Sequence, residues 1–222
     1  MGHKIPPKSS RLVITKDWDS KWFAGKNDYP LLVIEDEQIR NKITKHYGSN
    51  SGIARILINR NPQEITINIS TSKPGVLIGR QGKSIEEIKK ILAKTSTKKI
   101  HLNIIEIKRG DLNANIVSAS IGNQITKRIA YRRAVKQAIE KVMQSGAKGV
   151  KIIVSGRLNG AEIARRELYN EGSMPSSSLD EDIDFSIFHA KTTYGIIGIK
   201  VWIYIGKLNL SSDDINAVKT LF

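Results

Sequence analysis

The stretch Pro74-Gly-Val-Leu-Ile-Gly-Arg-Gln-Gly-Lys-Ser-Ile-Glu-Glu-Ile88 decides the fold of the first half of this chain. Within it, Gly79 and Gly82 bracket two polar residues, Arg80 and Gln81. An apolar turn comes before the glycines, and an amphipathic helical pattern comes after them. Because glycine has no Cβ, another backbone can approach such a turn very closely. The pattern therefore predicts a place where a phosphate chain meets the protein backbone.

The segments around this turn predict a small domain of helices and strands. From Tyr29 to Ile107 the apolar periodicity gives the order helix, strand, strand, short helix, glycine turn, helix, strand. A GxxG turn that clamps nucleic-acid backbone is the hallmark of the KH domain. We therefore expect a KH domain over residues 29–108. Its expected RNA-binding residues are Gly79, Arg80, Gln81, Gly82 and Lys83.

The charge balance points to the same class of partner. The chain of 222 residues has 36 Lys plus Arg against 21 Asp plus Glu, a formal net charge of +15 and a pI of about 9.9. Such a balance is typical of proteins that bind nucleic acid. The chain has no cysteine, so we expect no disulfide. Its four histidines lie far apart in the sequence, so we expect no metal site, and we expect no cofactor.

No segment predicts a membrane span or a leader peptide. The N-terminal residues lack an apolar core, and the longest apolar stretch, residues 194–206, is interrupted by Lys200. We expect a soluble protein of the cytoplasm.

Two enzymatic interpretations compete with RNA binding. Gly82-Lys83-Ser84 resembles the end of a P-loop, but that motif needs glycine at position 77, where Leu77 stands. A nuclease needs clustered carboxylates, and the run Asp180-Glu-Asp-Ile-Asp184 is the one candidate; we interpret it as a turn that leads into a strand. We therefore expect no catalytic residues and no small-molecule substrate.

The pattern of the second half predicts an α/β domain over residues 109–207. Outside the two expected domains, we expect a basic arm at residues 1–28 and a tail at residues 208–222. A helical region covers about 112–145 and has a break near Ala130. Strands are expected at 150–154, 182–193 and 197–205, whereas the pattern at 163–169 fits a helix or a strand.

Basic residues gather at two places in this half. Arg132, Arg133 and Lys136 share one solvent-facing side of the expected helix, where Glu140 is the only acid. They form either an RNA-binding face or simply a solvated one.

The other basic group flanks a glycine-rich loop. Arg157, Arg165 and Arg166 are suited to contacts with phosphate or sugar. The alternative is that two of these arginines pair with Glu162 and Glu167 at the surface.

Several segments, taken in order, resemble one family over about residues 1–207. They are Trp18-Asp-Ser-Lys-Trp22, Lys73-Pro-Gly-Val-Leu-Ile-Gly-Arg-Gln-Gly82, Asn103-Ile-Ile-Glu-Ile-Lys108, Ala130-Tyr-Arg-Arg-Ala134, Ser155-Gly-Arg-Leu-Asn-Gly-Ala-Glu-Ile-Ala-Arg165 and Thr193-Tyr-Gly-Ile-Ile-Gly-Ile-Lys-Val-Trp202. The chain is similar to the bacterial form of the KH-containing S-three family of small-subunit ribosomal proteins.

The resemblance implies an α+β fold: a type II KH domain followed by a mixed α/β domain. It implies binding to small-subunit rRNA, neighbouring small-subunit proteins as partners, and a place where mRNA enters the head of the subunit. Arg132, Arg133 and Lys136 match the family's basic positions facing incoming mRNA. The implied location is the ribosome in the cytoplasm. The high Ile, Asn and Lys content is compatible with an AT-rich genome, so an organellar ribosome is the alternative.

The chain also departs from the family pattern. Residues 173–182 are acidic and serine-rich where the family is normally basic, which argues against an RNA contact there. A free-standing KH regulator or processing factor is the alternative function.

Overall fold

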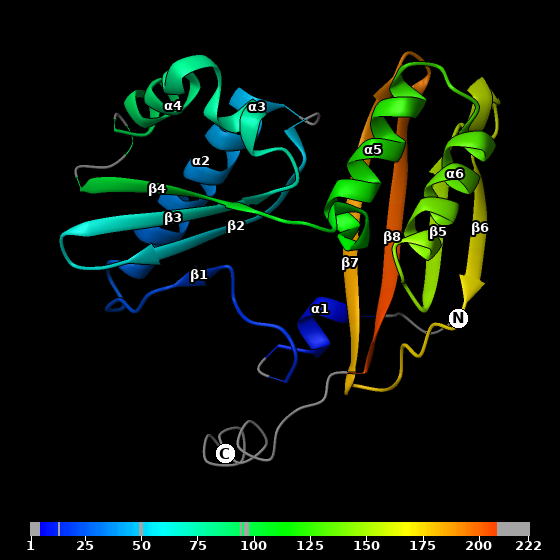
Figure 1. Cartoon of the computed structure of the whole chain (residues 1–222), viewed down its shortest axis with the longest axis horizontal. Coiled ribbons are helices and arrows are strands. Elements are labelled where there is room, and N and C mark those ends of the chain that lie inside the picture. The colour runs from blue at the N-terminus through cyan, green and yellow to red at the C-terminus, as the bar shows by residue number, and fades with distance from the viewer. Residues whose placement is uncertain (1–4, 13, 49–50, 94, 96–97, 208–222) are drawn as a thin grey trace. The chain divides into compact units, whose positions relative to one another are not determined.

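The computed structural model describes residues 5–12, 14–48, 51–93, 95 and 98–207. The tail expected at 208–222 lies outside the described residues. The chain forms two compact units. The GxxG unit is residues 18–110, and the C-terminal unit is made by the described parts of residues 1–17 and 111–222 (Figure 1).

The GxxG unit is a four-stranded sheet covered by helices. Its elements are β1 (Ser20–Lys21), α2 (Tyr29–Tyr47), β2 (Ile53–Arg60), β3 (Glu64–Thr71), α3 (Pro74–Ile78), a 3₁₀ turn (Arg80–Gly82), α4 (Lys83–Ala93) and β4 (Lys99–Glu106). The sheet order is β1-β2-β3-β4, with β2 and β3 antiparallel and β3 and β4 parallel. The element order expected from Tyr29 onward is confirmed.

Alternating isoleucines explain this core. Ile65, Ile67 and Ile69 on β3 are buried while their neighbours are less so, because successive side chains of a strand point to opposite faces. Ile39 and Ile43 lie four residues apart on one side of α2, and this side packs against the buried face of the sheet. The sheet and the helices thus share one apolar layer.

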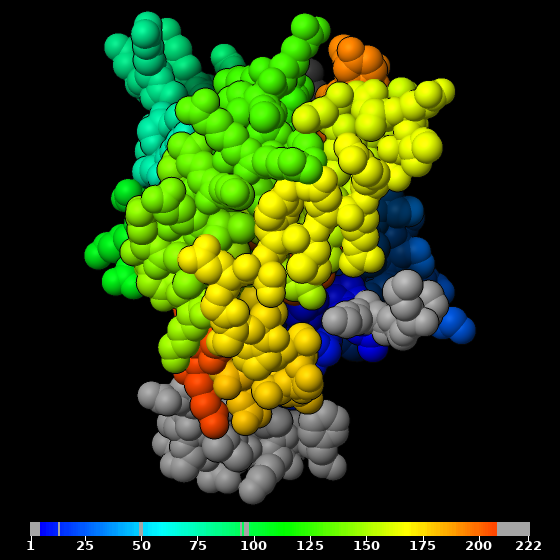
Figure 2. All heavy atoms as spheres, turned by 90° about the vertical axis from the view of Figure 1, so that its right-hand side faces the viewer, coloured from blue at the N-terminus to red at the C-terminus, as the bar shows by residue number. Residues whose placement is uncertain are grey.

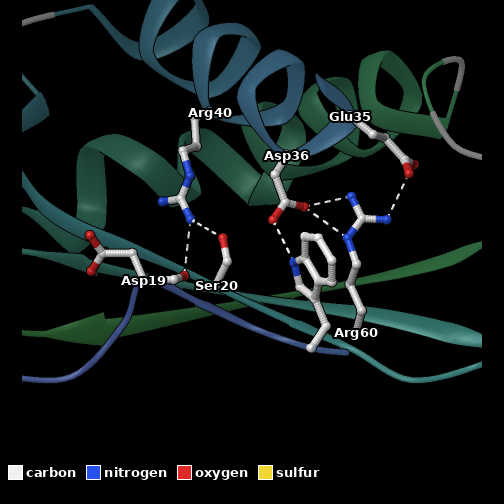
Figure 3. Close-up of polar contacts among 7 residues, drawn as sticks. Asp19, Ser20, Glu35, Asp36, Arg40 and Arg60 are labelled. Carbon is white, nitrogen blue, oxygen red and sulfur yellow. Dashed lines mark hydrogen bonds and ion pairs between the residues drawn. The ribbon is translucent and has the colours of Figure 1, made fainter. Parts of the chain in front are cut away.

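A buried carboxylate fastens residues 18–22 to this unit (Figure 3). Asp36 accepts hydrogen bonds from Trp22 Nε1 at 2.8 Å and from Arg60 Nε at 2.8 Å. Arg60 also donates to Glu35 at 2.7 Å. Nearby, Arg40 donates to the Ser20 hydroxyl at 2.7 Å. The second part of the segment expected to be a basic arm is therefore fixed on this unit by polar contacts.

The C-terminal unit is a four-stranded antiparallel sheet with two long helices on one face (Figure 1). Its elements are α1 (Pro7–Ser10), a 3₁₀ turn (Gly110–Leu112), α5 (Ala114–Thr126), α6 (Tyr131–Gln144), β5 (Gly149–Gly156), a 3₁₀ turn (Leu158–Gly160), β6 (Arg165–Gly172), β7 (Glu181–Thr192) and β8 (Gly195–Lys207). The sheet order is β6-β5-β8-β7. The segment that the sequence left undecided is the edge strand β6, and the expected break near Ala130 separates α5 from α6.

Residues near the N-terminus pack on this unit through a buried guanidinium. Arg11 is fully buried, and its Nε donates to the Glu181 carbonyl at 2.8 Å. Its Nη2 donates to the Ser178 carbonyl at 2.6 Å. Lys16 adds an ion pair with Asp182 at 2.6 Å. The predicted arm at 1–28 is thus divided: described residues up to 17 belong to the C-terminal unit, and residues from 18 belong to the GxxG unit.

We predict that Asp36→Asn lowers the free energy of unfolding of the GxxG unit by about 3 kcal/mol. The change removes the more buried of the two carboxylates that pair with the nearly buried Arg60 guanidinium, so only Glu35 still neutralises it. Hydrogen exchange of peptides from α2 and β2 measures the loss. Glu37→Gln removes an exposed carboxylate from the same helix and serves as the control; an equal effect of the two changes would contradict the role of Asp36.

Candidate nucleic-acid interface

The GxxG turn is a tight left-handed corner between two helices. α3 ends at Ile78, the C-cap residue Gly79 has φ 72°, and the Gly82 amide donates to the Gly79 carbonyl at 3.5 Å. Gln81 has φ 55° and ψ 26°, a conformation that non-glycine residues adopt rarely. α4 begins directly afterwards at Lys83. The backbone therefore turns within three residues and presents polar side chains at its tip.

The two glycines of the turn serve different purposes. A Cβ added to Gly79 would lie 2.7 Å from the Cβ of Ser84, so this glycine is required by contact within the protein. A Cβ added to Gly82 would meet nothing within 4 Å. Room for an approaching phosphate chain therefore exists at Gly82, whereas the sequence pattern assigned close approach to both glycines.

The surface around the turn combines cations with exposed apolar groups. Arg80, Gln81 and Lys83 are all exposed, and no described residue forms an ion pair with Arg80 or Lys83. Val76 is 54% exposed and Ile78 is 40% exposed. Such a surface can hold phosphates by charge and bases by apolar contact.

The expected basic residues of α6 all face solvent. Tyr131, Ala134, Val135 and Ala138 bury one side of this helix in the core, which leaves the other side exposed. Arg132, Arg133 and Lys136 lie on that exposed side. Figure 2 views the C-terminal unit from the side of α6 and β6. The structure thus brings these three cations together on one helix.

Arg132 differs from Arg133 and Lys136 because its guanidinium contacts the side chains of Tyr131 and Glu167. Its Nε donates to the Tyr131 hydroxyl at 3.1 Å, and its Nη2 lies 3.4 Å from Glu167 Oε1. Tyr131 and Tyr169 both donate hydroxyl hydrogen bonds to Glu167, at 2.7 and 2.6 Å. The guanidinium remains largely exposed, with 66% of the side chain accessible. Sequence reasoning missed this arrangement because Glu167 lies on a different element, 35 residues away.

These contacts shift the acid–base equilibria of the cluster. Hydrogen bonds from Tyr169, Tyr131 and Arg132 lower the pKa of Glu167 from 4.5 to about 2. Burial, followed by the hydrogen bond to Glu167, raises the pKa of Tyr169 to about 12. The hydrogen bond to Tyr131 raises the pKa of Arg132. The cluster is therefore ionised as Glu⁻ and Arg⁺ across the physiological range.

The arginines near the glycine-rich loop do not share one surface. Arg165 and Arg166 are successive exposed residues of β6, so their side chains point to opposite faces. Arg157 donates to the Ala161 carbonyl at 2.9 Å and to the Tyr194 carbonyl at 3.3 Å. The alternative pairing of two of these arginines with Glu162 and Glu167 does not occur among the described residues: Glu167 pairs with Arg132, and no ion pair links Arg157, Arg165 or Arg166 to either glutamate.

Comparisons with known proteins agree with both units. A KH domain family matches residues 38–112, and the family described as ribosomal protein S3, C-terminal domain, matches residues 121–203. Small ribosomal subunit protein uS3 of Desulforamulus reducens is 48% identical over 208 residues, 94% of each chain. Its counterpart in Clostridium botulinum strain Okra is 46% identical over 217 residues, 97% of each chain. The chain belongs to the uS3 family.

Membership of the uS3 family confirms the α+β fold and the expectation that the protein is not an enzyme. The segments that resembled a P-loop and a nuclease site have structural roles in the fold. Gly82 and Lys83 belong to the GxxG turn and not to a P-loop. In the acidic run, Asp184 accepts a hydrogen bond at 2.7 Å from the amide of Ala114, the first residue of α5, next to the N-cap residue Asn113.

Two features are absent from the part of the chain that the structure describes. Over residues 5–12, 14–48, 51–93, 95 and 98–207, no three His, Asp or Glu side chains gather as ligands for a metal ion. Within the same ranges, no helix is both long and apolar enough to cross a membrane.

We predict that Glu167 makes this uS3 chain sensitive to acid. Because folding lowers its pKa, its contribution to stability is complete above about pH 4.5 and disappears as the pH falls towards 2. Urea unfolding of the wild type and Glu167→Gln at successive pH values measures this contribution as a difference between the two proteins. The difference should shrink from pH 5 to pH 2.

Glu140→Gln is the matched control, because it removes an exposed carboxylate from α6. A difference between wild type and Glu167→Gln that stays constant with pH, or an equal pH-dependent difference for Glu140→Gln, would contradict the role of the cluster.

Proposed function

We propose that this chain is a structural component of the head of the small ribosomal subunit that binds small-subunit rRNA and incoming mRNA. The observation that carries the proposal is the exposed turn in which Gly82 leaves open space beside Arg80, Gln81 and Lys83. Neighbouring small-subunit proteins are its protein partners. It acts on the ribosome, in the cytoplasm or, if the ribosome is organellar, within the organelle.

Electrostatics supports binding to rRNA. With a net charge of +15, the chain can neutralise RNA phosphates, and the release of the counterions condensed on those phosphates favours binding. The GxxG turn adds a contact of defined shape, because it lies at the N-terminal end of α4 and carries the exposed side chains of Arg80 and Lys83. In the C-terminal unit, Arg157, Arg165 and Arg166 contact rRNA phosphates or sugars from more than one face.

The mRNA part of the proposal rests on α6. Arg132, Arg133 and Lys136 project from a helix whose opposite side is fixed in the core, so they form a stiff row of cations. Such a row binds the backbone of single-stranded RNA without reading its sequence. Its role would be to hold the message and to resist secondary structure ahead of decoding.

Sedimentation of the native chain from gently lysed cells tests the location. At low salt the protein should travel with the small subunit, and it should leave only at high salt because its contacts are ionic. A protein that stays at the top of the gradient would favour the alternative, a free-standing KH regulator or processing factor.

We predict that Arg80→Asp combined with Gln81→Asp weakens RNA binding by about tenfold or more. The change removes charge-assisted contacts and adds repulsion at the turn, while both side chains are exposed and the fold is preserved. Titration of labelled single-stranded RNA across a salt series measures the affinity and its salt slope.

Lys89→Asp combined with Lys90→Ala is the matched control, since it changes the net charge by the same amount at exposed positions of α4. Equal weakening by the two double variants would show that net charge, and not the GxxG turn, determines the affinity.

We predict a message-specific defect when Arg132, Arg133 and Lys136 are all changed to Ala. Translation of a message with a hairpin downstream of the start should slow several-fold in a reconstituted system, while an unstructured message is little affected. The control variant changes the exposed Lys141, Lys200 and Lys207 to Ala. Equal loss of subunit assembly would contradict a role at the channel where mRNA enters.

A further inference from the structure

Three turns of the C-terminal unit meet around a hollow that the GxxG turn and α6 do not explain. They are the turn between α5 and α6, the turn at residues 157–160, and the turn between β7 and β8. Figure 1 shows these turns at the same end of the unit, and Figure 2 shows the β7–β8 turn beside the segment that follows β5. The hollow has a volume of about 480 Å³, within the range of roughly 300–1,000 Å³ that ligand sites occupy.

The lining of the hollow has an apolar floor and a cationic rim. Ile125 and Ile197 are buried beneath it. Arg128 and Lys191 are exposed at its edge, and neither forms an ion pair with any described residue. No Asp or Glu is among the described residues that line it. The site therefore suits a ligand with a flat or apolar part and a negative charge.

Tyr194 gives the hollow a flat aromatic wall. The residue is 59% exposed although one edge of its ring rests on the neighbouring turn. A Cβ added to Gly160 would lie 3.2 Å from Cε2 of Tyr194, so the ring packs against the glycine backbone. The Arg157 guanidinium lies 5.9 Å from the ring centroid and donates to the Tyr194 carbonyl. The ring is thus held in place while much of its surface stays available.

The turn beside Tyr194 repeats the backbone of the GxxG turn. Asn159 has φ 55° and ψ 28°, against 55° and 26° for Gln81. Each is followed by a glycine with a similar positive φ, 77° at Gly160 and 76° at Gly82. In each turn the glycine amide donates to the carbonyl three residues earlier. Arg128, also at the hollow, has φ 63°.

We propose that this hollow binds one unpaired nucleotide of an RNA strand, with its base stacked on Tyr194 and its phosphate between Arg128 and Lys191. The Asn159 amide lies at the rim, where it can form hydrogen bonds to the base edge. An aromatic ring accepts any base on its face, and two cations neutralise the adjoining phosphates. The proposal deepens the proposed function and rests on it, because it names a defined nucleotide site within the RNA-binding surface of the C-terminal unit.

Titration of the full chain with a labelled single-stranded oligoadenylate of twelve nucleotides tests the site. Tyr194→Ala should weaken binding about tenfold, the size of one lost base–aromatic stack, whereas Tyr194→Phe should bind as the wild type does. Tyr29→Ala removes an exposed tyrosine from the GxxG unit and is the control for Tyr194→Ala. Lys191→Ala should weaken binding more than Lys200→Ala, which removes an exposed lysine of β8.

Photocrosslinking of the same oligonucleotide, followed by mass spectrometry, should identify Tyr194. Wild-type affinity in Tyr194→Ala, with the loss at Arg80 and Gln81 intact, would overturn the hollow as a site and leave the proposed function standing. Absence of RNA binding by the wild type would overturn both. Adenosine monophosphate that binds as tightly as the oligonucleotide and depends on Tyr194 would assign the hollow to a free nucleotide and overturn the RNA assignment.

Discussion

The excess of positive charge is the constraint on which the rest of this structure depends. A chain with a net charge of +15 must fold while its cations repel one another, and it must keep many of them available for a polyanion. Several acids form contacts that link separate segments of the chain, so they stabilise the fold at positions away from the exposed cations. Asp36 joins the segment around Trp22 to α2 and β2, Asp182 pairs with Lys16, and Asp184 accepts a hydrogen bond from the first amide of α5. These acids hold the scaffold together and do not neutralise the cations at the proposed interface.

Glu167 is an acid that orients a cation of the basic surface and still leaves that cation exposed to solvent. Two tyrosine hydroxyls supply its short hydrogen bonds, and the contact to Arg132 is the longest of the three at 3.4 Å. The carboxylate therefore restricts the motion of the guanidinium while most of that side chain still faces water. A restricted cation loses less conformational entropy when it binds a phosphate than a mobile one does. No described carboxylate pairs with Arg133 or Lys136, so on α6 side-chain contacts orient only Arg132, while all three cations project from the same helix.

Local patterns predicted much of this fold, and long-range contacts account for what they missed. Alternating isoleucines predicted β2 and β3, and the glycines predicted the turn between α3 and α4, since both signals depend on neighbouring residues. The sequence could not decide β6, because an exposed edge strand has no buried face to impose an apolar alternation. It also could not show that Arg11 is buried against carbonyls some 170 residues away. Partners that far apart leave no periodic signal.

Residues in the left-handed conformation occur at both proposed RNA sites, the GxxG turn that the sequence predicted and the hollow that it did not predict. In the described chain, the non-glycine residues with positive φ are Gln81, Arg128 and Asn159. Such a conformation costs free energy, and it persists where the surrounding structure imposes it, often at a binding site. Gln81 lies at the tip of the GxxG turn, and the other two lie around the hollow beside Tyr194. The sequence signalled the first through its paired glycines, whereas the second site depends on three turns that only the folded C-terminal unit brings together. A polar residue in a strained turn, next to unpaired cations, is thus a feature that the two units share. It is also the physical reason for assigning the same class of ligand to both.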